Sequence, residues 1–268
     1  MEINFISIYD NTAEAKYLFV SDSVTDILGY LPEELIGQGG YYLIHPDEKQ
    51  VLSIVHRGNV KNERMSCVNT YRNRHKDGHY VMCDVVVHYC YDVLICTNFA
   101  VVADDCVKHK ARASSADEVF AIQPDGSIRL TGSWNDSQER IKKLLAEKYP
   151  WDINKNVNTK QEPRFCLFIN RYTSLSIIVF ATQMCQELIG TNQMDLIGQS
   201  LYDYVDAKDR LNVEKLIDLS KSSDLINRMR FNWKRQDNGE LVPIEAVISC
   251  TFDGLVFVAR KSNCNTIQ

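Results

Sequence analysis

The chain has 268 residues, of which 45% are hydrophobic and 24% are charged, and its formal net charge is −5 at pH 7. This length exceeds the needs of one ordinary domain and suits two domains of about 100 to 130 residues, each with a sizeable core. A dedicated nucleic-acid surface normally carries a basic stripe, so we expect no direct nucleic-acid contact from this region.

Nine cysteines are present, an odd number, and no CxxC pair occurs. Most of them stand in or beside apolar runs, where a free cysteine behaves as a small hydrophobic residue. No signal-type segment opens the chain, and the longest apolar stretches have the length of a strand. We therefore expect a protein of a reducing compartment, cytoplasmic and/or nuclear, that does not bind a membrane.

The first hundred residues predict a strand-rich start, a group of helices and a strand-rich end. Two short β-rich runs precede two short helical segments that stop at Gly29 and Gly37, where glycine is a plausible C-cap. A longer helix follows, with Leu52, Val55 and His56 on an apolar stripe, and an Asp-Gly turn then joins the last strands. The expected elements cover residues 5–9, 16–20, 22–29, 32–36, 47–57, 79–90 and 93–102.

Residues 104–163 are predicted to form a linker, because polar and loop-like stretches dominate there. Within it, residues 119–122 form a possible strand and residues 137–148 a helix, with Asp136 as N-cap and Glu139 three residues later. The apolar stripe of this helix packs on its own chain or docks in a groove of a partner subunit. The stripe consists of Ile141, Leu144 and Leu145.

An internal repeat is the strongest signal in the sequence. Residues 26–38, DILGYLPEELIGQ, align with residues 187–199, ELIGTNQMDLIGQ, at a shift of 161 residues. The register continues without a gap over roughly 90 residues, which predicts two copies of one module. Its domains are residues 1–103 and residues 164–268. Further pairs at this shift include Ile8 with Ile169, Phe19 with Phe180, Tyr41 with Tyr202, and Arg74 with Arg235.

Each copy has the order β-β, helices, β-β-β. This order predicts an α+β fold, a five-stranded antiparallel sheet with helices on one face. In the second copy Met229, Phe231 and Trp233 alternate with polar residues, as in a half-buried strand. We consider this stripe, together with that of the linker helix, a candidate partner interface.

The first copy contains SDSVTDILGYLPEELIGQ, then YYLIHPDE and later RHKDGHYV. These segments resemble the PAS domain, and the resemblance covers roughly residues 5–102 and 166–261. The second copy departs from the pattern, with DAKD at 206–209 where the first has HPDE at 45–48. The tandem arrangement is similar to the PAS-A/PAS-B region of basic helix-loop-helix PAS transcription factors and of clock and light-response regulators. This resemblance implies homo- or heterodimerisation with another PAS protein.

The resemblance also raises the question of a cofactor. Light-sensing members need a reactive cysteine, and residues 38–46 and 199–207, the corresponding segments, contain none. Some haem-binding members ligate iron from the long helix, so His56 is a candidate axial ligand. Because Arg57 and Gly58 follow it, the helix could end there, and His56 would then be an ordinary histidine near a helix C-terminus. We expect no cofactor, with haem or a small apolar ligand as the alternative.

Metal and catalytic sites are not expected. The candidate zinc ligands lack the close pairing of structural zinc sites, and nothing in the spacing brings the six histidines together. No P-loop, GxSxG or HExxH motif occurs, so the chain is not expected to be an enzyme. Asp84 and its counterpart Glu245 are interpreted as exposed strand positions on a surface used for pairing. The zinc candidates considered are His79, Cys83, His88, Cys90 and Cys96.

These features predict a signalling or transcription-regulating protein that acts by PAS-mediated dimerisation. The alternative is a sensor that holds haem or a small apolar ligand in a PAS cavity.

Overall fold

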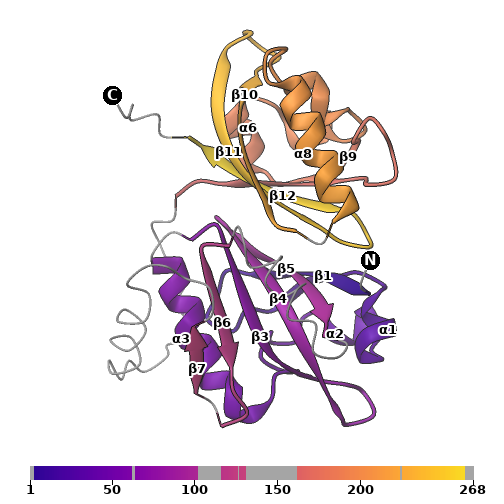
Figure 1. The fold of residues 1–268 in the computed structure, drawn as a ribbon, viewed down its shortest axis with the longest axis vertical. Helices are drawn as coiled ribbons and strands as arrows, with labels where there is room; N and C mark the ends of the chain where they lie inside the picture. Colours follow the sequence, from indigo (N-terminus) through magenta and orange to yellow (C-terminus); the bar gives the residue numbers. More distant parts are fainter. Residues whose placement is uncertain are drawn as a thin grey trace. The chain divides into compact units, whose positions relative to one another are not determined.

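The computed structural model describes residues 3–61, 64–101, 116–125, 127–130, 162–223 and 225–262. The chain divides into two compact units, residues 1–161 and 162–268, which are described separately (Figure 1). Among the helices described, none combines the length and the apolar character that a membrane crossing requires. The predicted linker helix at 137–148, with Ile141, Leu144 and Leu145, lies outside the described residues.

The first unit is a seven-stranded sheet with three helices packed on one face. Its strands follow the order β2-β1-β5-β4-β3-β6-β7. Alternate strand residues such as Val85 and Val87 form one core with Leu28, Leu35 and Val55 of the helices. The elements are β1 (Asn4–Asp10), β2 (Tyr17–Val20), α1 (Val24–Leu28), α2 (Pro32–Leu35), α3 (Pro46–Lys61), β3 (Ser66–Arg74), β4 (Tyr80–Cys90), β5 (Val93–Ala100), β6 (Glu118–Ile122) and β7 (Ile128–Leu130).

The five strands expected in the first copy are all present, and two more extend the sheet. β6 pairs in parallel with β3, and β7 pairs antiparallel with β6. Asp117, just before β6, accepts hydrogen bonds from the backbone N–H groups of Met65 (2.7 Å) and Ser66 (3.1 Å). The unpaired edge of β3 offers backbone groups that need partners, and this segment supplies them. Residues 118–130 therefore belong to the first sheet and not to a linker.

The second unit is a five-stranded antiparallel sheet, in the order β10-β11-β12-β8-β9, with helices on one face. This arrangement confirms the predicted α+β fold class. The elements are β8 (Phe165–Ile169), β9 (Ile178–Ala181), α6 (Met184–Ile189), α7 (Gln193–Leu196), the 3₁₀ helix η1 (Leu201–Tyr204), α8 (Arg210–Ser222), β10 (Asn227–Lys234), β11 (Leu241–Cys250) and β12 (Leu255–Lys261).

Unusual backbone conformations recur at equivalent positions of the two units. Gly29 ends α1 with φ 74° and Gly190 ends α6 with φ 70°, in the left-handed region that glycine adopts without steric cost. Ala15 and Ser176, also 161 residues apart, have φ 48° and 50°. Two copies that share such local detail are copies of one fold.

Strand pairing corrects the repeat by one residue in the third strand. Arg74 lies opposite Tyr80 in the first sheet, and Lys234 lies opposite Leu241 in the second. Since Tyr80 and Leu241 keep the shift of 161, Arg74 corresponds to Lys234 and not to Arg235. The prediction of an ungapped repeat is wrong at this strand. It is wrong at the first strand too, where Tyr9 and Ile169 lie opposite Leu94 and Leu255, so that Ile8 corresponds to Phe168.

Turn length is the reason for the correction at the third strand. The N–H of His75 donates to the carbonyl of His79, whereas the N–H of Arg235 donates to the carbonyl of Glu240. The second hairpin thus has one residue more in its turn, and its third strand is displaced by one residue. On the inner face of the sheet, Met229, Phe231 and Trp233 therefore take the places of Asn69, Tyr71 and Asn73.

The predicted partner stripe on the third strand is core. Met229, Phe231 and Trp233 belong to the hydrophobic core of the second unit, and Trp233 is completely buried. Its indole stacks on Tyr204, with ring centroids 4.9 Å apart, and meets Phe165 edge to face at 5.9 Å. The alternation does mark one buried face of the strand, as predicted, but the helices of the same unit cover that face. These side chains are not available to a partner, and the interface prediction is wrong for them.

We expect Trp233→Ala to lower the free energy of unfolding of the second unit by about 3–5 kcal/mol, because it leaves a large cavity in a packed core. Arg230→Ala is the control on the opposite face of the same strand. Arg230 is exposed and pairs with Glu245 at 3.3 Å, so its removal costs about 1 kcal/mol or less. Denaturant titration of both variants measures the difference. Equal losses would contradict the placement of Trp233 in the core.

Candidate functional site

A cavity of about 50 Å³ lies in the first unit between α3 and the inner face of the sheet. This volume suffices for several water molecules or a ligand of a few non-hydrogen atoms. Most of its walls are apolar or aromatic. The side chains that bound it on the helix and strand sides include Tyr41, Leu52, His56, Asn69, Tyr71 and Cys96.

His56 brings an imidazole to this cavity. The helix does not end at Arg57 and Gly58 but continues to Lys61, and only 7% of His56 is exposed. Its ring stacks on Tyr89, with centroids 5.6 Å apart, and no hydrogen-bond partner reaches Nε2. Burial lowers the pKa of His56 from 6.5 to about 4, so the imidazole is neutral at physiological pH.

Asn69 is a second polar group of the cavity wall, and no pattern in the sequence pointed to it. It is 2% exposed, and its Oδ1 has no hydrogen-bond partner among the described residues. Burial also raises the pKa values of the neighbouring Tyr41 and Tyr71, which keeps both phenols uncharged. The cavity therefore presents neutral polar atoms in an apolar setting, and a neutral ligand with hydrogen-bonding groups suits it.

Haem does not fit this site. Pockets for drug-sized ligands measure about 300–1,000 Å³, several times the volume present beside His56. A macrocycle would have to displace the helix or the sheet. His56 is a buried imidazole that can donate or accept one hydrogen bond, and the geometry supports no iron ligation.

The second unit has apolar side chains at the equivalent positions. Ile217 on α8 corresponds to His56, and Met229 on β10 corresponds to Asn69. Both are buried in the core of that unit. Larger apolar side chains thus replace the two unpartnered polar groups, so the polar cavity wall is a property of the first copy.

An exposed apolar surface recurs in both units at the edge strands β2 and β9. The pairing of β1 with β2 and of β8 with β9 is interrupted by a β-bulge at the same position. Two consecutive side chains at each bulge stay accessible to solvent. They are Leu18 (50% exposed), Phe19 (42%), Val179 (50%) and Phe180 (37%), which we call the edge pairs.

Asp84 (1% exposed) and Glu245 (8%) are buried and have polar partners, so their interpretation as exposed strand positions is wrong. Asp84 accepts a hydrogen bond from the hydroxyl of Thr70 at 2.7 Å. Glu245 lies between Arg260 (2.9 Å) and Arg230 (3.3 Å), on three neighbouring strands. Burial opposes ionisation of Glu245, but the hydrogen bonds and charges of the two arginines outweigh it and lower its pKa. Both carboxylates are therefore already engaged in hydrogen bonds or ion pairs within the sheet.

Seven cysteines are described, and all seven are buried free thiols. Burial raises the pKa values of Cys83 and Cys185 to about 12, so these thiols stay protonated and are poor metal ligands. The considered zinc set does not assemble, because Cys83 belongs to the core cluster whereas Cys90 lies on the other face of the same strand. The histidines, however, are not all apart, since the rings of His75 and His79 stack with centroids 4.4 Å apart.

The fold and the repeated sequence pattern define a tandem arrangement of PAS-type units. Residues 17–93 match the family described as "PAS fold", and residues 164–258 match the family described as "PAS domain". The chain therefore belongs to the PAS family, with two PAS domains.

More specific similarity is limited to part of the chain. It is 35% identical over 68 residues to "Basic helix-loop-helix ARNT-like protein 2" of Gallus gallus, and 34% identical over 68 residues to "Basic helix-loop-helix ARNT-like protein 1" of Homo sapiens. Each match covers 25% of this chain and 11% of the relative. The chain thus matches about a tenth of the length of these curated relatives.

Neutral His56 makes the stability of the first unit depend on pH. The pKa of His56 is lower in the native state than in the unfolded chain. Between about pH 6.5 and pH 4, His56 is therefore protonated in the unfolded chain but not in the native state. Stability is full above about pH 6.5 and falls as the pH drops toward 4, by roughly 3 kcal/mol. The uncharged Tyr41, Tyr71 and Tyr89 around the ring offer no compensating charge.

We expect His56→Leu to flatten this loss. The measurement is the free energy of unfolding of the first unit at pH 7.5, 5.5 and 4.5, compared with the unchanged chain. His45→Gln, which removes a half-buried histidine outside the cavity, should retain the slope. A His56→Leu variant that loses as much stability on acidification as the unchanged chain would show that His56 is not buried neutral.

Proposed function

We propose that the chain acts in signal transduction and transcription regulation by PAS-mediated pairing, as a homodimer or as a heterodimer with another PAS protein. PAS domains are typical of signalling and commonly mediate dimerisation. The observation that carries the proposal is the recurrence of the edge pairs at the same bulge of both units. Under this proposal the chain works by binding and not by catalysis.

The edge pairs have the character of an interface. Consecutive exposed apolar side chains lose water-accessible area on association, which is the main favourable contribution to binding. In the second unit Phe180 packs on Phe168, with ring centroids 5.0 Å apart, so one aromatic side chain is held in place before a partner arrives. A side chain that is already ordered loses less entropy on binding.

The bulges also favour one mode of contact. A flat edge strand invites another strand to extend the sheet, whereas a bulge twists the edge and interrupts its hydrogen-bonding pattern. β2 and β9 are four residues long and bulged, which disfavours sheet extension. A partner would therefore contact the side chains of Leu18 and Val179. In a homodimer, the same patch of each chain could meet its equal in the other, which is a symmetric, isologous contact.

The partial similarity to the ARNT-like proteins supports the regulatory part of the proposal, since their name includes a basic helix-loop-helix. The described cysteines support a cytoplasmic or nuclear setting, because buried free thiols persist in a reducing compartment.

A second candidate function is the sensing of a small neutral ligand in the first unit. The unpartnered Nε2 of His56 and Oδ1 of Asn69 favour it, because buried polar atoms are usually satisfied by a partner. Native mass spectrometry of the purified chain tests this candidate. A mass equal to that of the polypeptide alone, in the unchanged chain and in Asn69→Leu, would exclude a retained ligand.

For the pairing proposal, we expect Leu18→Asp combined with Val179→Asp to raise the dissociation constant of the dimer at least about tenfold, since charge at a desolvated contact costs 1.4 kcal/mol or more. Sedimentation velocity across a dilution series from tens of micromolar measures it. Leu211→Asp is the matched control, because Leu211 is 64% exposed on α8, away from the edge strands.

Two results would contradict the proposal. The first is a chain that stays monomeric at tens of micromolar and binds no ARNT-like PAS chain in the same assay. The second is an equal effect of Leu211→Asp, which would mean that any exposed charge disturbs association. A thermal melt of each variant confirms that the fold is retained.

A further inference from the structure

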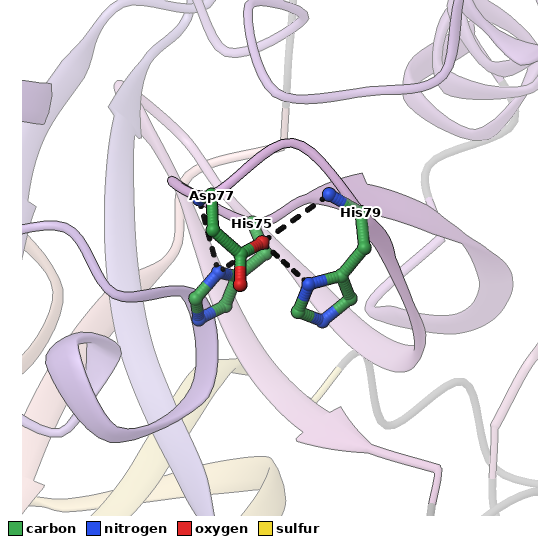
Figure 2. Close-up of side chains that lie close together, drawn as sticks. All are labelled: His75, Asp77 and His79. Atoms are coloured by element: carbon green, nitrogen blue, oxygen red, sulfur yellow. Dashed lines mark hydrogen bonds and ion pairs between the residues drawn. The ribbon is translucent and has the colours of Figure 1, made fainter.

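The hairpin between β3 and β4 brings three metal-binding side chains together (Figure 2). Nδ1 of His75 lies 2.9 Å from Oδ1 of Asp77, and Nδ1 of His79 lies 2.5 Å from the same oxygen. One carboxylate oxygen thus bridges the Nδ1 atoms of the two stacked imidazoles. One donor atom from each residue lies within 4.8 Å of the donor atoms of the other two.

The hairpin is held by contacts that do not depend on these side chains. The N–H of His75 donates to the carbonyl of His79 at 2.8 Å, which closes the turn. The N–H of Lys76 donates to the carbonyl of Leu28 at 2.9 Å, and its ammonium pairs with Glu34 at 2.7 Å. These bonds fix the turn to the end of α1 and to α2.

Gly29 leaves room for the ring of His75. A Cβ at position 29 would come within 2.9 Å of Cε1 and 3.0 Å of Nε2 of that imidazole. The ring is therefore confined between the end of α1 and the turn, with a quarter of its side chain exposed. Donors that are ordered before an ion arrives lose little entropy when they bind it.

The donor set selects a class of ion. Two imidazole nitrogens and one carboxylate oxygen suit zinc and its neighbours, whereas magnesium and calcium prefer oxygen ligands throughout. Zinc lies about 2.0–2.2 Å from such donors, which puts two ligands of a tetrahedral site about 3.3 Å apart. Both imidazole nitrogens stand somewhat closer than that to the Asp77 oxygen, so a small outward movement of the exposed Asp77 and His79 would accommodate the ion.

We propose that His75, Asp77 and His79 bind a divalent transition-metal ion of the zinc class at this hairpin. Asp77 and His79 are more than half exposed, so water can complete the coordination sphere. Binding replaces hydrogen bonds within the turn by bonds to one ion and fixes the hairpin more firmly beside α1. This role is separate from pairing, since the edge pairs lie on other elements.

The second unit provides a natural comparison. Arg235 occupies the place of His75 beside Gly190, and its guanidinium pairs with Asp237 at 2.6 Å and 2.9 Å. Glu240 follows where the first hairpin has His79. The second hairpin is thus closed by an ion pair, and an arginine cannot coordinate a metal ion.

Titration calorimetry with ZnCl₂ on the full chain tests the proposal. Cys106→Ser and Cys264→Ser serve as background, because these two thiols lie outside the described residues. We expect one site, with the affinity at least about tenfold lower in His75→Arg and in His79→Gln. His75→Arg copies the second hairpin and can keep the turn closed by pairing with Asp77. His45→Gln is the control. His45 pairs with Asp47 at 3.6 Å and packs on Tyr80, but it belongs to no group of three metal-ligating side chains among the described residues, so its loss should leave the affinity unchanged.

A second readout follows the ion directly. Zinc should shift the ring-proton resonances of His75 and His79 in NMR spectra and leave those of His45 in place. Equal zinc affinity of the background chain and of His75→Arg would overturn the proposal. The absence of any binding at about 100 µM zinc would overturn it as well. A thermal melt of each variant without metal separates lost ligands from lost fold.

Discussion

Both PAS folds depend on the packing of one long helix against the inner face of the third strand. In the second fold Ile217 of α8 and Met229 of β10 satisfy this constraint with buried apolar side chains. In the first fold His56 of α3 and Asn69 of β3 stand at the interface, and each has a buried polar atom without a partner. A buried polar group without a hydrogen bond costs about 1–3 kcal/mol. The first core carries this cost at His56 and Asn69, whereas the second carries it elsewhere, at Nε1 of Trp233.

That cost has a chemical consequence. A buried neutral imidazole resists protonation, and a buried amide oxygen without a donor gains from any ligand that supplies one. The stability of the first core is thereby linked to proton concentration and to the occupant of the cavity. Since the second core has apolar side chains at both places, its stability lacks these two linkages.

Most of the fold could be predicted from the sequence, because local chemistry determines it. Glycines 29 and 190 end helices with positive φ, and the strands follow their apolar alternation. The apolar alternation could not show what covers Trp233. A strand face that is buried by a helix and one that is buried by a partner have the same sequence pattern. The one-residue difference between the hairpins was equally hidden, because the Asp-Gly and Asn-Gly turns of the two copies align without it.

The candidate sites needed three-dimensional information for a different reason. His56 and Asn69 are 13 residues apart on a helix and a strand, and only packing reveals that they share a cavity. His75 and His79 could have been noticed as an HxDxH pattern over a turn, but strand alternation treats them as outward residues of separate strands. Their convergence results from the tight turn, in which residues four apart lie across the ladder from each other.

The two domains differ consistently at equivalent places. Where the first has His56 and His75, groups that exchange protons or bind ions, the second has Ile217, which packs, and Arg235, which forms a fixed ion pair. The exposed apolar bulges, in contrast, are present in both. An apolar surface that is present in both domains suits an association with two points of attachment. Histidines that are present at these places in one domain suit a response to a single small solute. We therefore propose that the asymmetry separates association, to which both domains contribute, from chemical responsiveness, which among the residues described belongs to the first domain.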